Sequence, residues 1–172
     1  QRRQLSGEAF KLLLVAARKT AGWHKPDDRI SISQFIEETG SSRASVIKST
    51  RELVARSVLI KHAANKKGTE YTLNMPDPAL GFTAYDNRIL DKILRFLTGN
   101  EAKIVSFFYE CWTYEIGFSI KEARGFEYDK YRAKPISYRA ISAATTIPLQ
   151  SVKQAVKDLE EHLVISLVRE AR

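Results

Sequence analysis

Basic and small polar side chains recur at helical spacing in residues 41–54, which read SSRASVIKSTRELV. One stripe of this segment can pack inward, and it consists of Val46, Thr50 and Leu53. The opposite stripe points outward, and it consists of Ala44, Lys48 and Arg51. Long cationic side chains can reach base edges and phosphates, and small ones permit close approach to a groove. The pattern is typical of a helix that reads the major groove of duplex DNA.

Three predicted elements precede this segment and would position it. Residues 5–18 begin with Leu-Ser-Gly-Glu and carry a broad apolar face, which predicts a first helix. Residues 29–33 alternate like a short strand, and Ser33 is placed to cap a second helix over residues 34–39. Gly40 then ends that helix in a tight turn, and the DNA-reading helix follows at once. The order predicts a helix-turn-helix.

A β-hairpin is predicted directly after the helix-turn-helix. Residues 58–73 contain two short strands, VLIKH and TEYTL, separated by an Asn-Lys-Lys-Gly turn. A hairpin at this place is the wing of a winged helix, and its tip carries Lys66 and Lys67. Both lysines are placed to contact phosphates or the minor groove. We therefore expect a first winged-helix domain over residues 1–75.

A linker and a second copy of this domain follow. Residues 76–85 contain two prolines and a glycine, which stop helices and strands alike. Residues 86–172 form the second predicted domain, which opens with a helix to about residue 97. Leu97-Thr98-Gly99 matches Leu5-Ser6-Gly7 at a shift of 92 positions, and the chain from Ile136 matches the first copy at a shift of 106. The sequence thus predicts tandem winged helix-turn-helix domains, mainly α with small β-hairpin wings in an α+β fold.

The second copy has its own candidate DNA-reading helix, residues 148–161. Its outward side chains are Gln150, Lys153, Gln154 and Lys157. Glutamine can read adenine edges and lysine can reach guanine or phosphate, but Asp158, Glu160 and Glu161 make the far end acidic. DNA and protein therefore stay open as partners of this helix. The chain stops at Arg172, where the last wing strand should follow, so the second wing is truncated or absent and we expect a fragment of a longer protein.

The charge of the chain is concentrated in the first predicted domain. The formal net charge is +8, from 28 Lys and Arg against 20 Asp and Glu, which favours a polyanionic partner. Residues 1–75 hold 14 basic and 7 acidic side chains, whereas residues 76–172 hold 14 and 13. Cys111 is the only cysteine, and the sequence has neither a membrane-spanning apolar run nor a signal peptide. We expect a cytoplasmic protein that does not associate with membranes.

The sequence lacks the usual patterns of catalytic and metal sites. His24, His62 and His162 lie far apart, without Cys or Glu at metal-binding spacing. Neither a Gly-rich phosphate loop nor a nucleophile elbow is present. We therefore expect no enzymatic activity, no metal and no cofactor. The inserted residues 117–134 interleave aromatic and basic side chains, which suits either stacking on single-stranded bases or a loop that covers the local core.

Residues 18–31, RKTAGWHKPDDRIS, place an unusual Lys-Thr-Ala-Gly-Trp loop before the helix-turn-helix. In this loop and the segment after it, the chain resembles the N-terminal winged helix of phage replication protein O and related replication initiators. The likeness continues through Ser33-Gln34, Thr39-Gly40, Ser42-Arg43, Val46 to Leu53, and Leu59-Ile60. It covers residues 5–62, about a third of the chain. The resemblance implies binding to repeated sites in a replication origin, with other parts of the protein recruiting the host helicase or its loader.

The leading hypothesis is sequence-specific binding of double-stranded DNA, as an origin-binding replication initiator of a phage, plasmid or other mobile element. The alternatives are a transcriptional repressor of similar architecture and a winged-helix adaptor for a replicative helicase or its loader. The DNA sites would be repeated or palindromic, and a homodimer is one way to bind them. The predicted DNA contacts in the first copy are Ser42, Arg43, Ala44, Ser45, Lys48, Arg51, Lys66 and Lys67.

Overall fold

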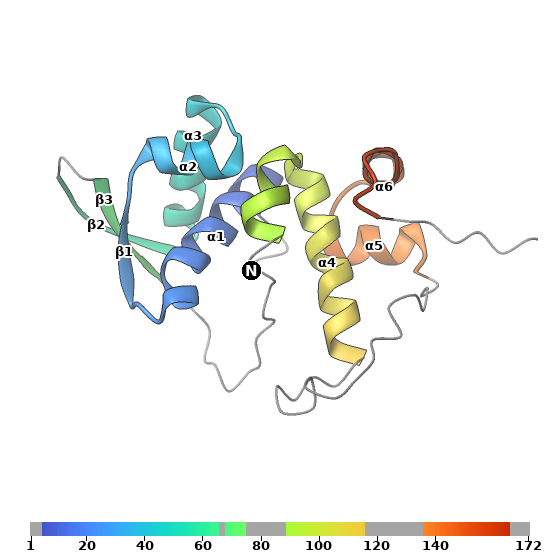
Figure 1. The fold of residues 1–172 in the computed structure, drawn as a ribbon, viewed down its shortest axis with the longest axis horizontal. Coiled ribbons are helices and arrows are strands. Elements are labelled where there is room, and N and C mark those ends of the chain that lie inside the picture. Colours follow the sequence, from blue (N-terminus) through green and yellow to red (C-terminus); the bar gives the residue numbers. More distant parts are fainter. Residues whose placement is uncertain (1–4, 66–67, 75–88, 116–135, 166–172) are drawn as a thin grey trace, which may run out of the picture. The chain divides into compact units, whose positions relative to one another are not determined.

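The computed structural model describes residues 5–65, 68–74, 89–115 and 136–165 (Figure 1). The chain divides into two compact units between Lys103 and Ile104. Helices predominate in the described residues, and the strands there form a small antiparallel sheet of three. The predicted α+β fold class is therefore confirmed. Among the helices described, none combines the length and the apolar character needed to cross a membrane.

The first unit follows the predicted order of helix, strand, helix, helix and hairpin, and then continues beyond the hairpin. In chain order its elements are α1 (Gly7–Lys19), η2 (Ala21–Trp23), β1 (Asp27–Ile30), α2 (Ile32–Thr39), α3 (Arg43–Ala55), β2 (Leu59–Asn65), β3 (Gly68–Leu73), η4 (Ile89–Ile93), η5 (Leu94–Phe96) and the start of α4 (Gly99–Glu115). The arrangement is winged-helix-like, with α1, α2 and α3 beside the three-stranded sheet (Figure 1).

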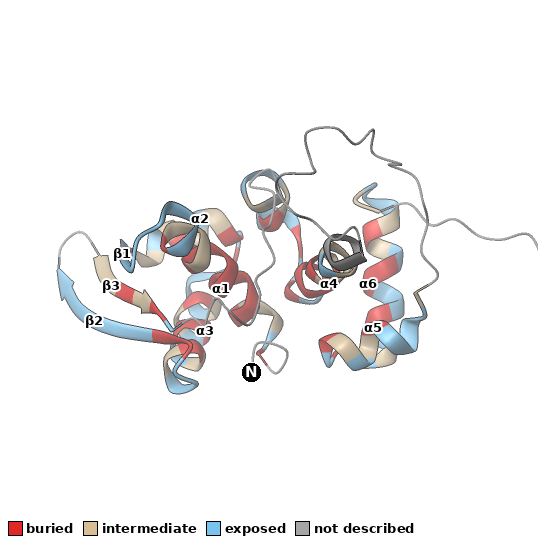
Figure 2. Cartoon of the chain, turned by 90° about the horizontal axis from the view of Figure 1, so that it is seen from below, coloured by how far each residue is buried: buried red, intermediate tan, exposed pale blue. Residues whose placement is uncertain are grey.

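Helix α1 forms the centre of this unit. It begins where the Ser6 hydroxyl accepts a hydrogen bond from the backbone N–H of Ala9, and Glu8 lies in its first turn, where the helix dipole favours an acid. Its residues from 9 to 16 are all buried, and Figure 2 shows this run in red between its neighbours. Burial on nearly every side explains why the apolar face in the sequence is so broad.

Helix α2 begins two residues earlier than the sequence suggested. Ser31, and not the predicted Ser33, is its cap. The Ser31 hydroxyl accepts from the N–H of Gln34 at 3.1 Å, and the Gln34 side chain accepts from the N–H of Ser31 at 2.8 Å. This reciprocal capping box satisfies two donors at once, which a cap at Ser33 would not do. The predicted strand over 29–33 is correspondingly wrong in its limits, because Ser31 has left the sheet.

The sheet has the strand order β1-β3-β2, and both pairings are antiparallel. The predicted hairpin is confirmed, with Leu59 opposite Leu73 and Asn65 opposite Gly68. The register shifts between Lys61 and Ala64, which marks a bulge in β2. Strand β1 joins the outer edge of β3, an association between distant parts of the chain. The sheet therefore ties the loop after α1 to the wing.

The helix-turn-helix packs on the sheet through a small aromatic and aliphatic core. The rings of Phe35 and Tyr71 meet edge to face, with centroids 6.1 Å apart. Val46 and Leu53 of α3 are fully buried, as is Ile30 at the end of β1. This core fixes the orientation of α3 about its own axis, because its buried stripe cannot turn outward without exposing apolar surface.

Residues 89–103 pack with the first unit, although the sequence repeat counts them with the second copy. The regular α-helix predicted to about residue 97 is wrong for residues 89–96, which form a π turn followed by a 3-10 turn. The buried Lys11 ammonium donates to the Leu97 carbonyl at 2.6 Å, and this holds the segment against α1. Burial lowers the pKa of Lys11, although the charges of Glu8 and Glu101 act in the opposite direction.

In the second unit, the helices begin and end where the repeat places them. Helices α5 (Tyr138–Thr145) and α6 (Leu149–Glu161) lie at a shift of 106 from α2 and α3. The end of α5 also repeats the end of α2, since Thr146 has φ +60° where Gly40 has φ +67°. Pro148 is the cap of α6 and not its first residue. The second wing would fall largely outside the described residues, as do the predicted linker and the 117–134 insertion.

Candidate nucleic-acid interface

Helix α3 presents the two faces that the sequence predicts. Ser42 caps it by accepting from the N–H of Ser45 at 3.2 Å. The inward residues Val46, Thr50 and Leu53 are all buried. Along the opposite side the exposed residues are Ser42, Arg43, Ala44, Lys48 and Arg51, with Ser45 partly exposed. The predicted orientation is therefore confirmed, and it leaves a basic, sterically open helix face in contact with solvent.

The ion pairs of the first unit do not neutralise the positive charges on this outward face of α3. Several of its basic side chains have acidic partners, and these pairs are Lys19 with Glu38 at 2.6 Å, Arg29 with Glu70 at 2.8 Å, Arg56 with Glu52 at 3.5 Å, Lys25 with Asp28 at 3.9 Å, and Arg18 with both Asp91 and Glu38. In the part of the chain that the structure describes, Arg43, Lys48 and Arg51 have no ion pair. Their positive charges are thus available to a polyanion, whereas the positive charges beside α1 and β1 are paired with carboxylates of the protein.

Glu52 is the only acidic residue of α3, and it faces α1. Its carboxylate accepts from the N–H of Ser6 at 2.8 Å and from the Ser6 hydroxyl at 2.6 Å. Burial alone would raise the pKa of Glu52, but the two hydrogen bonds and the positive charges of Arg56 and Lys103 together lower it below its ordinary value. The contact fastens α3 to the start of α1 and keeps a negative charge off the outward face.

This contact predicts a pH-dependent contribution to stability. Because folding lowers the pKa of Glu52, its contribution is complete above the ordinary glutamate pKa of about 4.3 and is lost as the pH falls through the lower folded value. We expect Glu52→Gln to destabilise the protein near neutral pH, with a smaller difference in acid. Urea unfolding between neutral pH and pH of about 3 measures this difference. Glu37→Gln, at an exposed site on α2, is the control, and an equal effect there would refute the assignment.

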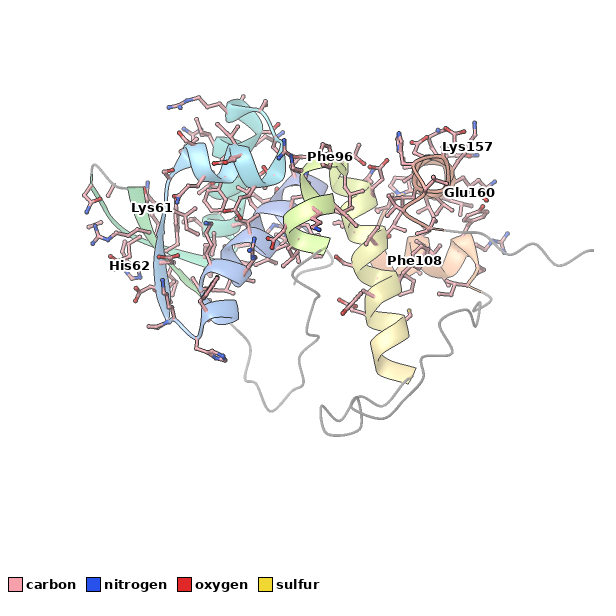
Figure 3. All side chains as sticks on the ribbon, viewed as in Figure 1. Lys61, His62, Phe96, Phe108, Lys157 and Glu160 are labelled. Carbon is pink, nitrogen blue, oxygen red and sulfur yellow. The ribbon has the colours of Figure 1, made fainter. Side chains whose placement is uncertain are left out.

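The wing adds a cation that the sequence reasoning missed. Lys66 and Lys67 lie outside the described residues, so their contacts stay a prediction. Lys61 of β2 is exposed, and no ion pair involves it within the described ranges. Figure 3 shows Lys61 and His62 on this strand, where the ring of His62 lies 2.8 Å from the Thr72 hydroxyl. The sequence does not reveal that β2 is exposed on both faces from Ile60 to its end, and without that information Lys61 could not be singled out.

Residues 1–76 match the family model of bacteriophage replication protein O. The predicted resemblance is thereby confirmed, and the match extends past residue 62 to the end of β3. The matched residues include α1, α2, α3 and all three strands of the sheet. Searches of curated proteins and of solved structures found no match to the chain.

Helix α6 lies outside the residues that match replication protein O, and its surface differs from that of α3. Its predicted outward residues Gln150, Lys153, Gln154 and Lys157 are all exposed. Two of them are engaged within the helix, because Gln154 donates to Asp158 at 2.7 Å and Lys157 pairs with Glu161 at 3.3 Å. These exposed contacts are weak, but the Lys157–Glu161 pair reduces the positive charge that α6 offers to DNA, and the Asp158 contact occupies a donor of Gln154.

The described ranges contain no cluster of potential metal ligands. No group of three or more His, Cys, Asp and Glu side chains there is arranged to hold a metal ion. The chemistry of the interface is therefore that of hydroxyl, guanidinium and ammonium groups on α3 and β2, which donate hydrogen bonds to anionic or carbonyl acceptors.

Proposed function

We propose that this chain binds specific sites in double-stranded DNA as a replication initiator of a phage, plasmid or other mobile element. The carrying observation is the unpaired cationic face of α3, in a domain that matches bacteriophage replication protein O. A helix of this size fits the major groove, whose base edges carry a distinct pattern for each base pair. The proposed role is non-catalytic and needs no cofactor.

The contacts divide by type along α3 and the wing. Ser42, Arg43, Ala44 and Ser45 form the start of the helix, where a helix-turn-helix approaches base edges. Lys48 and Arg51 lie one and two turns further on, where they can reach guanine edges or phosphates. Lys61, Lys66 and Lys67 of the wing would neutralise phosphates at the edge of the same site. This arrangement combines readout of sequence with an electrostatic anchor.

The proposal includes two winged helices in tandem, with different tasks. The repeat of α2 and α3 as α5 and α6, at one constant shift, supports a second domain of the same design. The internal pairs of Gln154 and Lys157 and the acidic end of α6 favour a protein surface over a second DNA reader. A replicative helicase or its loader is the partner that suits an initiator, and a homodimer would suit a palindromic site.

Selection of bound duplexes from a random pool tests this function. We expect enrichment of one short motif, which would occur as a direct or inverted repeat if two domains or two protomers bind together. Binding measured afterwards on that motif should weaken steeply with added salt, because phosphate contacts release counterions. Retention on heparin without enrichment of any duplex would refute specific DNA binding and favour an adaptor that binds only protein.

A further inference from the structure

Arg95 and Phe96 form an exposed pair of a cation and an aromatic ring outside the segment that matches replication protein O. The guanidinium carbon of Arg95 lies 4.9 Å from the centroid of the Phe96 ring. Phe96 is 74% exposed, and Figure 3 shows it at the surface of its segment. Arg95 is also exposed, and in the described residues no carboxylate pairs with it. Stacking on the ring restricts the guanidinium to few orientations and leaves its N–H groups free.

The position of this pair is fixed beside the turn of the helix-turn-helix. η5 packs against α2, and the carbonyl of Arg95 lies so close to Gly40 that a Cβ added there would be 2.2 Å from its oxygen. The buried Leu94 and Leu97 anchor both ends of η5. Gly40 begins the connection that leads to α3 at Arg43. The backbone of Arg95 thus lies beside the turn that leads to α3.

We propose that Arg95 binds the phosphate backbone of the duplex that α3 enters, and that Phe96 holds its guanidinium in place. This inference rests on the proposed function. In a helix-turn-helix, the helix before the turn crosses the DNA backbone while the second helix lies in the major groove. A cation fixed beside that turn therefore faces phosphates. The planar guanidinium can bind a phosphate through two parallel hydrogen bonds. Arg95 would thus extend the DNA-binding surface beyond the residues that match replication protein O.

Variants of the full chain test this contact in a fluorescence anisotropy titration. Phosphate contacts do not depend on sequence, so the probes are a duplex of arbitrary sequence and the selected duplex. We expect Arg95→Ala to weaken binding to both by about threefold to tenfold, and to reduce the slope of log affinity against log salt by about one. Phe96→Leu should weaken binding less and keep the slope, because the charge remains. Circular dichroism verifies that each exposed-site variant is folded.

Lys25→Ala is the control for net charge, because it removes one positive charge from an exposed site in the loop before β1, where the Lys25 ammonium lies 3.9 Å from Asp28. An equal effect of Lys25→Ala and Arg95→Ala would show that the change in net charge alone explains the loss of affinity, and it would overturn the proposal. Unchanged affinity and slope in Arg95→Ala, while Lys48→Ala with Arg51→Ala loses binding, would overturn this contact and leave the proposed function intact. Failure of the unaltered chain to bind either duplex would overturn both.

Discussion

Replacement of Lys48 and Arg51 by alanine together is expected to weaken specific DNA binding strongly while the protein stays folded. Both side chains are exposed on α3 and have no ion pair in the described residues, so their removal leaves the core intact. Each good contact to a base edge contributes about 1 to 3 kcal/mol. The double variant should therefore lose about 2 to 6 kcal/mol, which is a roughly 30-fold or greater loss of affinity. Anisotropy titration with the selected duplex measures this loss directly.

Two further double variants make the result interpretable. Lys25→Ala with Arg139→Ala removes two positive charges from exposed positions outside α3, and it should retain most of the specific affinity. Gln154→Ala with Lys157→Ala changes the positions of α6 that the repeat makes equivalent to Lys48 and Arg51. A small effect there agrees with a protein-binding role for α6. Unaltered specific affinity after loss of Lys48 and Arg51 would remove α3 from the interface.

The parts of the fold that sequence alone predicted are those set by local spacing. The orientation of α3 follows from apolar residues three and four positions apart, and the structure buries Val46, Thr50 and Leu53 as that spacing requires. The repeat at a shift of 106 predicted α6 to within a residue, because apolar spacing and turn positions recur together. The predicted helix over 34–39, shifted by 106, gives the end of α5 but begins two residues late, as it does for α2. Their hydrogen bonds recur as well, since Thr145 donates to Ile141 as Thr39 donates to Phe35.

Contacts between distant segments were beyond the reach of this reasoning. The cap of α2 is an exception, because Ser31 and Gln34 have the S-x-x-Q spacing of a capping box, which the sequence itself displays. The orientation of Glu52 toward Ser6 depends on how α1 packs against α3. The positions of η4 and η5 depend on contacts with α1 and α2, which no local pattern encodes. These contacts determine which charges stay available at the candidate interface.

The turn at Gly40 illustrates how one distant contact supports both stability and the interface. Gly40 has φ +67°, a conformation that costs other residues about 1 to 2 kcal/mol. A Cβ at this position would also lie 2.2 Å from the Arg95 carbonyl oxygen, and backbone atoms cannot move aside as a flexible side chain can. The turn before α3 therefore requires glycine for two independent reasons, its backbone conformation and the close approach of η5.

We accordingly expect Gly40→Ala to lower the free energy of unfolding of the first unit by about 2 to 5 kcal/mol, measured by urea denaturation with circular dichroism. Gly22→Ala is the matched control, because its nearest neighbour is 3.6 Å away and it should change stability by less than about 1 kcal/mol. Gly40→Asn separates the two causes, since asparagine tolerates positive φ but retains a Cβ. Equal losses in the Asn and Ala variants would assign the effect to the contact with Arg95. Equal stability of Gly40→Ala and Gly22→Ala would show that η5 does not press against this turn. That outcome would also contradict the rigid placement of Arg95 beside the turn before α3.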